Sequence, residues 1–435
     1  MSDTRTSEYI DGLARFIQAG PSSYHAARET ADRLVAAGAV ELDESADWPT
    51  TAGRYVVVRD GAVIAWIAPE GAGPLTPFRI LGAHTDSPGF KLKPHPTTVV
   101  NGWLQAGVEV YGGPLLNSWL DRELELAGRL VTTDGEEHLV RTGPFLRIPQ
   151  LAIHLDRGVN NDGVKLDKQR HTQPVWGVGL NTASQGTQDA LLEHLAGLAG
   201  VAASDIAGYD IMTADTTAPA RFGLDDALFA AGRMDNLTSV FAGLTALLAA
   251  GSADDPAVEH ISVLAAFDHE ELGSESRSGA AGPFLADVLE RIGAGLGASS
   301  SDRLRALASS WCVSADAGHA VHPNYAERHD PVNKPVPGGG PLLKINANQR
   351  YATDAAGAAL WARLCAAAGV PFQEFVSNNA IPCGSTIGPI TATRLGIRVV
   401  DVGAPLLSMH SARELVHVDD AAALAAAVTA FFAGK

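Results

Sequence analysis

Cysteine is scarce in this chain, and so are aromatic side chains. The 435 residues include three cysteines, Cys312, Cys365 and Cys383, and only 6% are aromatic. The cysteines are far apart and odd in number, which excludes a disulfide framework and a CxxC metal site. This usage favours a reducing compartment, so we expect a cytoplasmic protein.

Basic residues are also in the minority. Lys and Arg total 32 against 49 Asp and Glu, which gives a formal net charge of −17. Such a charge repels phosphate backbones and anionic lipid headgroups, so we expect neither nucleic acid nor membrane as a partner. The segment MSDTRTSEYIDG lacks the apolar core of a secretion signal. No run reaches the ~20 mainly apolar residues that a membrane helix needs.

The apolar pattern of the chain differs between two regions, one typical of α/β structure and one typical of β structure. From about residue 222 onward, apolar strands alternate with helices, and Ile261–Phe267 is a continuous apolar strand of the kind found in parallel sheets. Between Pro94 and Arg221, short strand-like pieces are separated by Gly, Pro and Asn. We therefore predict an α/β fold with a mostly parallel central sheet covered by helices, formed by residues 1–94 and 222–435. Residues 95–221 are predicted to form an inserted β-rich domain.

Candidate metal-binding and catalytic residues lie where predicted strands end or predicted helices begin. In chain order they are His84 with Asp86, Asp235, Glu270 with Glu271, Asp316 and His410. Sites in parallel sheets lie beyond the carboxyl ends of the strands, so we expect these residues to meet in one cleft. Two imidazoles and several carboxylates without a thiolate suit two zinc-like or manganese-like ions that share a water.

Each position by itself has a simpler explanation. Asp235 precedes an apolar helix and could cap it, while His84, His319 and His410 could be packed or surface histidines. The pair Glu270–Glu271 could be an exposed turn, but two glutamates at the end of a buried strand are costly unless they bind something. We interpret one as a metal ligand and the other as a general base. The turn matches neither HExxH nor GxSxG.

With these residues identified, the chain resembles the M18 family of metallopeptidases, the aspartyl aminopeptidases, over essentially its whole length. The resemblance rests on GAHTDSPGFKLKP (82–94), GRMDN (232–236), FDHEELGS (267–274), HAVHPNY (319–325), KINANQRYATD (344–354) and MHSARE (409–414). The first, third and last of these are shared in looser form by other two-zinc peptidases. The segment KINANQRYATD is far more specific to this family.

The resemblance implies a role for each candidate residue. It implies that one ion is held by His84, Asp235 and Asp316, and the other by Asp235, Glu271 and His410, with Asp235 bridging. It implies that Glu270 is the general base, that Asp86 supports the site, and that His319, Lys344 and Tyr351 line the substrate pocket. In the segment PQLAIHLDR (149–157), His154 is expected to reach the active site of a neighbouring subunit. Gln150 stands where the family pattern places a histidine, which leaves the structure of this loop open.

The implied activity is removal of an N-terminal Asp or Glu from peptides, with Lys344 meeting the acidic side chain. The cofactors would be two divalent ions, zinc first, with manganese or cobalt as alternatives. The fold would be a peptidase domain with an inserted dimerisation domain, assembled as homodimers into a tetrahedral homododecamer. Two other functions stay open: a broad aminopeptidase or amidohydrolase, and an inactive scaffold or ligand-binding protein. The presence of every proposed ligand and of the base disfavours the scaffold.

Overall fold

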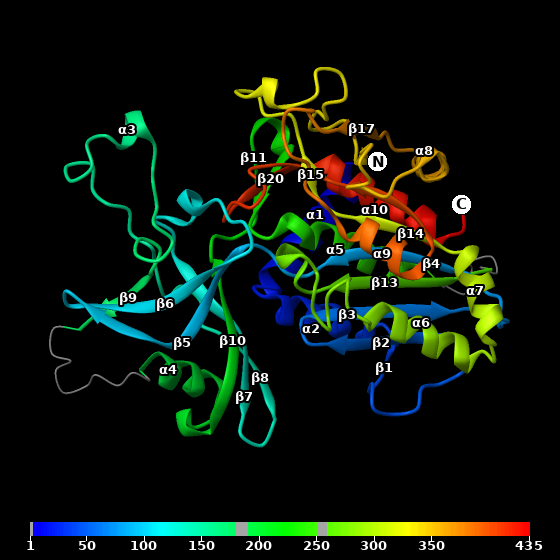
Figure 1. Cartoon of the computed structure of the whole chain (residues 1–435), viewed down its shortest axis with the longest axis horizontal. Helices are drawn as coiled ribbons and strands as arrows, with labels where there is room; N and C mark the ends of the chain where they lie inside the picture. The colour runs from blue at the N-terminus through cyan, green and yellow to red at the C-terminus, as the bar shows by residue number, and fades with distance from the viewer. Residues whose placement is uncertain (1–2, 180–189, 251–258) are drawn as a thin grey trace. The chain divides into compact units, whose positions relative to one another are not determined.

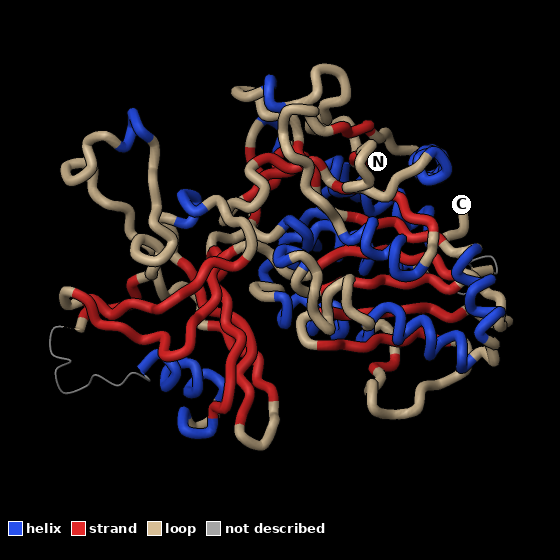
Figure 2. Tube along the Cα trace, in the orientation of Figure 1, coloured by secondary structure: helices blue, strands red, loops and turns tan. Residues whose placement is uncertain are grey.

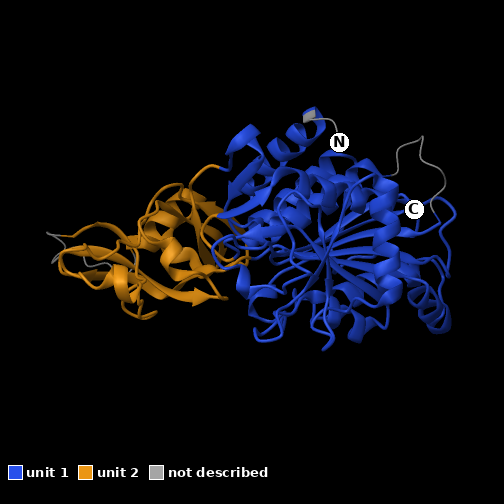
Figure 3. Cartoon of the chain, turned by 90° about the horizontal axis from the view of Figure 1, so that it is seen from above, with its two compact units in different colours: residues 1–86, 219–409, 414–435 blue, residues 87–218, 410–413 orange. Residues whose placement is uncertain are grey.

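The structure is a computed structural model that describes residues 3–179, 190–250 and 259–435. It divides into two compact units (Figure 3). The first unit comprises residues 1–86, 219–409 and 414–435, and the second comprises residues 87–218 and 410–413. Helices and strands alternate through most of the first unit, whereas strands dominate the second (Figure 2).

Within the described residues, the first unit is built around a nine-stranded sheet (Figure 1). From one edge to the other its strands are β1 (Val40–Glu41), β2 (Gly53–Arg59), β3 (Ala62–Ala68), β13 (Ile261–Phe267), β4 (Phe78–His84), β14 (Trp311–Ala315), β18 (Arg398–Gly403), β16 (Leu342–Ile345) and β17 (Gln373–Val376). The central strands β13, β4, β14 and β18 run parallel to one another. On either side, β3 and β16 pair with them in the antiparallel sense.

Helices cover both faces of this sheet. They are α1 (Asp3–Ala19), α2 (Ser23–Ala36), α5 (Met234–Ala249), α6 (Phe284–Gly295), α7 (Ser300–Ala308), α8 (Ala355–Ala368), α9 (Ile387–Leu395) and α10 (Val418–Phe432). Every residue of β13 is buried. Leu264 and Ala266 pack in the core that contains α5 and α10, while Val263 and Ala265 pack in the core that contains α6. Burial on both faces explains why this strand reads as a continuous apolar run, and the predicted α/β fold is confirmed.

A smaller five-stranded sheet also belongs to the first unit. Its strands, in order, are β11 (Ala220–Phe222), β12 (Leu228–Ala231), β20 (Glu414–His417), β19 (Pro405–Leu407) and β15 (Gly318–His319). Pairing of β12 with β20 places Glu414 opposite Ala231. Residues 232–236, which follow β12, therefore start beside Glu414.

The second unit contains a six-stranded antiparallel sheet among its described residues. In order its strands are β8 (Glu137–Arg141), β7 (Leu124–Thr132), β10 (Ile206–Asp215), β5 (Gly89–Val100), β6 (Trp103–Tyr111) and β9 (Val175–Val178). Its own core includes Phe90 and Trp119, whose rings meet edge to face at 5.4 Å between centroids. Leu191 and Leu195 of α4 (Ala190–Ala199) join this core, so the unit has a hydrophobic centre of its own.

Across the described parts of the chain, no helix is both long enough and apolar enough to cross a membrane.

Close backbone packing at Gly403 supplies a test of the central sheet. A Cβ at this position would lie 1.7 Å from the carbonyl oxygen of Asp316, which follows β14. We expect Gly403→Ala to lower the free energy of unfolding by about 1–3 kcal/mol, because the backbone must shift to admit the methyl group. Chemical or thermal denaturation measures this change.

The matched control is Gly73→Ala, since a Cβ at Gly73 would meet nothing within 4 Å. That variant is expected to stay within about 0.5 kcal/mol of the parent protein. Equal stability of the two variants would contradict the packing described for β14 and β18.

Candidate metal site

His84 is the last residue of β4 and is almost fully buried. Its Nε2 atom lies 3.2 Å from Asp235 Oδ1, 3.4 Å from Asp316 Oδ1 and 4.0 Å from Glu270 Oε2. The strand ends meet here because β4 and β13 run parallel with His84 opposite Phe267. Three carboxylates from distant parts of the sequence thus surround one imidazole nitrogen.

Asp86 holds the other side of the same ring. Its backbone carbonyl oxygen lies 3.0 Å and its Oδ1 atom 3.3 Å from His84 Nδ1. Its carboxylate also accepts the backbone N–H groups of Glu270 at 3.0 Å and Glu271 at 3.1 Å. Asp86 therefore directs Nε2 of His84 toward the other carboxylates. It also joins the backbone of Glu270 and Glu271 to the end of β4.

Glu270 and Glu271 begin η5 (Glu270–Leu272), a single 3-10 turn that follows β13. His269 before the turn has a φ of 62°, and Gly273 after it has a φ of 95°. The left-handed region is strained for a histidine and open to glycine. This sharp reversal keeps two successive glutamates, both partly buried, at the end of a buried strand.

The crowded carboxylates shift the pKa values of the groups among them. Burial raises the pKa of Glu270 to about 8; His84 opposes this shift, while Asp316, Asp86 and Asp235 add to it. For His84, burial alone would lower the pKa, but hydrogen bonds to the surrounding aspartates raise it well above the usual value. In the metal-free cluster, protons partly neutralise the carboxylates, a task that a divalent cation would take over.

The donor atoms are close enough to share a cation. Ligand atoms of His84, Asp235 and Asp316 all lie within 4.8 Å of one another, and so do those of His84, Glu270 and Glu271. These groups supply an imidazole nitrogen and carboxylate oxygens, a donor set that suits Zn²⁺ or Mn²⁺. The residues present therefore fit a divalent metal ion.

Asp235 lies in the first turn of α5 and is buried. The side-chain amide of the next residue, Asn236, donates a hydrogen bond to the carbonyl oxygen of Ala315 at 2.9 Å. This bond ties the start of α5 to the last residue of β14, so that Asp235 and Asp316 approach His84 from neighbouring segments.

Two supporting residues were missed by sequence reasoning, although both lie in segments that it singled out. The buried carboxylate of Glu414, in MHSARE, accepts the backbone N–H of Asp235 at 2.9 Å. Arg233, in GRMDN, donates to the carbonyl oxygen of Thr85 at 2.5 Å, between His84 and Asp86. Both residues fix the backbone that carries predicted ligands.

Lys344 lies in β16 with only 1% of its surface exposed. Its ammonium lies 3.2 Å from Asp316 Oδ2 and donates to the carbonyl oxygen of Ala317 at 2.7 Å. The same group lies 5.3 Å from the centre of the Tyr351 ring, a cation–π distance. The sequence predicts Lys344 as a substrate-binding residue, but it does not predict this ion pair with Asp316.

The other predicted pocket residues lie near the same strands. In the pairing of β16 with β17, Lys344 is opposite Phe375. The ring centroid of Phe375 lies 6.2 Å from that of Tyr351, which is buried, and 6.4 Å from that of His319, which is exposed on β15. Lys344, Tyr351 and His319 thus gather around one aromatic side chain.

Two predicted residues belong to the second unit. His154 is exposed, and so are the neighbouring apolar side chains Leu151, Ile153 and Leu155. His410 is the first residue of the segment 410–413, and its ring nitrogen Nδ1 lies 3.0 Å from the carbonyl oxygen of Gly113.

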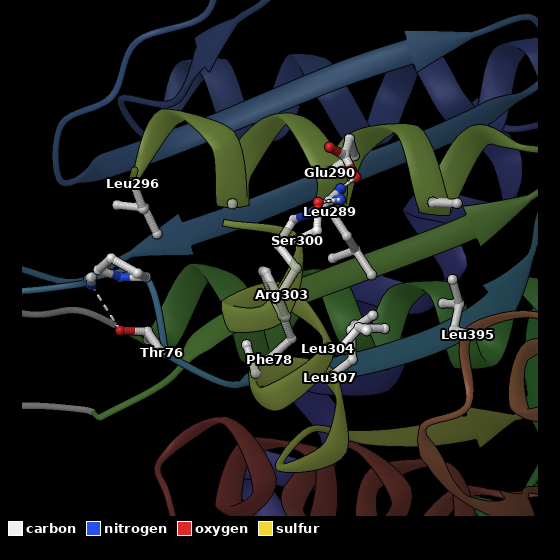
Figure 4. Close-up of a pocket in the computed structure, with 15 residues that line it drawn as sticks. Thr76, Phe78, Leu289, Glu290, Leu296, Ser300, Arg303, Leu304, Leu307 and Leu395 are labelled. Carbon is white, nitrogen blue, oxygen red and sulfur yellow. Dashed lines mark hydrogen bonds and ion pairs between the residues drawn. The ribbon is translucent and has the colours of Figure 1, made fainter. Parts of the chain in front are cut away.

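A pocket in the first unit is distinct from this cluster (Figure 4). It has a volume of about 300 Å³ and is lined mainly by apolar side chains of α6 and α7, such as Leu289 and Leu307. Its charged residues, Glu290 and Arg303, form an ion pair with each other. Phe78, the first residue of β4, lines it, whereas His84 is the last residue of that strand. The pocket therefore lies at the opposite end of β4 from the acidic cluster.

Comparisons with known proteins agree with this geometry. Residues 16–432 match the family model described as aminopeptidase I zinc metalloprotease (M18). The chain is 56% identical over 427 residues to a probable M18 family aminopeptidase 2 of Streptomyces avermitilis, covering 98% of each protein. The cryo-EM structure of the Ape4 and Nbr1 complex matches with a TM-score of 0.93 and 35% identity, over 99% of this chain and 86% of that one. The S. cerevisiae mApe1 dodecamer matches with a TM-score of 0.83 and 28% identity, over 98% and 96%.

The chain belongs to the M18 family of zinc metalloproteases, as the sequence motifs predict. It is an aminopeptidase, a hydrolase that removes residues from the amino end of peptides.

Removing divalent ions should make the stability of the protein fall as pH rises. The folded pKa of Glu270, about 8, lies above the ordinary value of 4.5, so the folded state binds this proton more tightly than the unfolded state. The contribution of this proton to the free energy of unfolding is complete below pH 4.5 and is lost as the pH rises toward 8. His84, whose pKa is also raised, acts in the same direction from 6.5 upward. Melting temperatures of chelator-treated protein, measured across this range, test the prediction.

Reloading with Zn²⁺ should remove most of this pH dependence, since the cation then balances the carboxylates. A Glu270→Gln protein without metal should also show a weaker dependence, because one titrating group is gone. If metal-free and metal-loaded proteins gave parallel melting curves across the range, the cluster would not be a metal site.

Proposed function

We propose that this protein removes N-terminal Asp or Glu residues from peptides with the help of two divalent metal ions. The observation that carries the proposal is the gathering of His84 and several carboxylates at the carboxyl ends of β4, β13 and β14. Membership of a zinc aminopeptidase family supports metal-dependent hydrolysis. The preference for acidic N-terminal residues goes beyond what family membership supports, and we base this preference on Lys344.

We assign the ligands as two sets that share one carboxylate. His84, Asp235 and Asp316 would hold the first ion, and Asp235, Glu271 and His410 would hold the second. Bound ions would polarise the scissile carbonyl group and lower the pKa of the attacking water. Zinc is the metal we propose, in line with the family description.

We assign Glu270 as the general base. It is partly buried beside His84, at the edge of the ligand cluster, where a carboxylate can accept a proton from water and return it. It takes a proton from the attacking water and passes it to the leaving amine. Asp86 keeps Glu270 in place by accepting its backbone N–H.

Lys344 is our candidate for recognition of the acidic side chain. An ammonium group has three N–H donors, and two are used for Asp316 and the carbonyl oxygen of Ala317. We assign the third to the substrate carboxylate. In a buried site, a neutral side chain would leave this donor without an acceptor and would bind more weakly. Tyr351 lines the same pocket, and His319 is assigned to stabilise the oxyanion.

We also propose that the protein acts as an oligomer. The S. cerevisiae mApe1 structure is a dodecamer. For this chain we propose homodimers formed through the second unit, which assemble into a tetrahedral homododecamer. His154 lies in a run with exposed apolar side chains, of which Leu155 is 76% exposed, as expected of a segment that another subunit covers. In this assembly, His154 of the partner subunit completes the oxyanion site. The sparse, free cysteines accord with a cytoplasmic location.

A broad aminopeptidase is the second candidate, and one observation favours it. Lys344 is nearly inaccessible and already paired with Asp316, so its task could be limited to holding that carboxylate. In that case the enzyme would not distinguish acidic from neutral N-terminal residues.

Glu270→Gln should slow hydrolysis strongly while leaving metal binding intact, because the amide cannot accept the proton. We expect kcat to fall by about 10²–10⁴-fold, the usual contribution of a general base. Steady-state kinetics and metal analysis on the same preparation check this. Full activity at unchanged metal content would overturn the assignment of the base.

Lys344→Met should reduce kcat/KM for Asp and Glu substrates far more than for Leu or Ala substrates. We expect a difference of about 10-fold or more, since the substituted side chain offers no donor to the carboxylate. A panel of aminoacyl p-nitroanilides measures it. An equal loss for all substrates would mean that Lys344 only holds the Asp316 carboxylate and does not recognise the substrate side chain. That result would favour the broad aminopeptidase.

A further inference from the structure

Asp401 is a fully buried carboxylate in the middle of β18 and takes no part in the proposed chemistry. Its exposed fraction is 0%, and its neighbours Val400 and Val402 are apolar core residues. A carboxylate in such a place is costly unless hydrogen-bond donors surround it.

Three donors meet this carboxylate at short distance. The hydroxyl groups of Ser314 and Thr386 each donate to Oδ1 at 2.6 Å, and the backbone N–H of Ala352 donates to Oδ2 at 2.6 Å. The backbone N–H of Asp401 in turn donates to Thr353 Oγ1 at 2.9 Å. Ser314, Thr353 and Thr386 are themselves buried, so their hydroxyl groups are shielded from solvent.

The segments joined by Asp401 carry the assigned chemistry. Ser314 lies on β14, two residues before Asp316, which pairs with Lys344. Ala352 directly follows Tyr351, whose ring lies against the ammonium of Lys344. A single carboxylate therefore fixes both the strand that delivers a metal ligand and the segment that lines the substrate pocket.

The third segment is the beginning of α9. Thr386 is the residue before this helix, and a Cβ at Gly388 would lie 2.3 Å from Asp401 Oδ2. The carboxylate thus sits against the first turn, where the helix dipole favours negative charge. Burial raises the pKa of Asp401, while its three hydrogen bonds and the charge of Lys344 lower it.

We propose that Asp401 is a positioning residue, which sets Tyr351 and Asp316 relative to each other without touching the substrate. The proposal rests on the proposed function only for the identity of the pocket. An alternative role is purely structural: the network would then stabilise the fold and leave the affinity of the folded enzyme for its substrate unchanged.

Two substitutions separate these roles. Asp401→Ala removes all three acceptor contacts. Asp401→Asn keeps the shape: its oxygen can accept the N–H of Ala352, and its amide can donate to the hydroxyls of Ser314 and Thr386 after these rotate. We expect KM to rise about 10-fold or more in Asp401→Ala, because misplacement by about 1 Å is enough for large losses. Asp401→Asn should recover KM to within about threefold of the parent.

KM is the decisive readout because it does not depend on the fraction of enzyme that is folded. Metal content is measured in parallel and should be retained in Asp401→Asn. A matched control is Glu125→Gln in the second unit, which alters another buried carboxylate, one bound by Arg141 at 2.7 Å. It should leave KM unchanged.

If Asp401→Ala fails to fold, Ser314→Ala removes one of the donors while Asp401 remains. This variant should raise KM about threefold, and Asp401→Asn should add little to it, because the two changes act on one contact. A KM within twofold of the parent in every folded variant would overturn the proposal.

The kinetics are run on whichever aminoacyl substrate the parent enzyme hydrolyses best. A lack of preference for acidic residues would then disprove the proposed specificity while the effect of Asp401 on KM could still be measured. Conversely, an unchanged KM beside a clear acidic preference would disprove only the role of Asp401.

Discussion

Mutual repulsion of carboxylates around the His84 ring is the constraint on which the arrangement of the first unit depends. Asp235, Asp316 and Glu270 all approach one imidazole nitrogen within 4.0 Å. Such a cluster persists only if each acidic group has donors on its remaining sides or a cation in the middle. The sheet brings the charges together, and the surrounding segments supply donors: Lys344 for Asp316, and backbone N–H groups for Asp86 and Glu414.

Two of these supporting carboxylates have the same task. Asp86 accepts the N–H groups of Glu270 and Glu271, and Glu414 accepts the N–H of Asp235. Each holds the backbone of a predicted ligand instead of its side chain, which leaves the ligand oxygens directed at the centre. Holding ligands through their main chain lets the site be formed before a cation arrives, which reduces the ordering cost of binding.

The sequence was informative wherever a residue followed a strongly patterned strand. The apolar runs before His84, Glu270 and Asp316 predicted both the parallel sheet and the meeting of these residues at its edge, because strand ends in a parallel sheet coincide. The contact of Lys344 with Asp316 could not be predicted in this way. It depends on the register in which β14 and β16 pair with β18, and the apolar pattern of the sequence does not fix that register. The sequence around Asp401 does carry a signal, because a carboxylate inside an apolar strand requires buried hydrogen-bond donors.

The order of segments in the first unit also matters during synthesis. Strand β4 is made early, but its neighbours on both sides, β13 and β14, come after residue 260 and after residue 310. Until those strands leave the ribosome, His84 ends an unpaired strand edge, and the acidic residues that surround it have not all been made. Contacts this distant in sequence form late in folding. A partly translated chain therefore has no assembled centre with which to attack other peptides, and β4 leaves the ribosome with the backbone groups of both its edges unpaired.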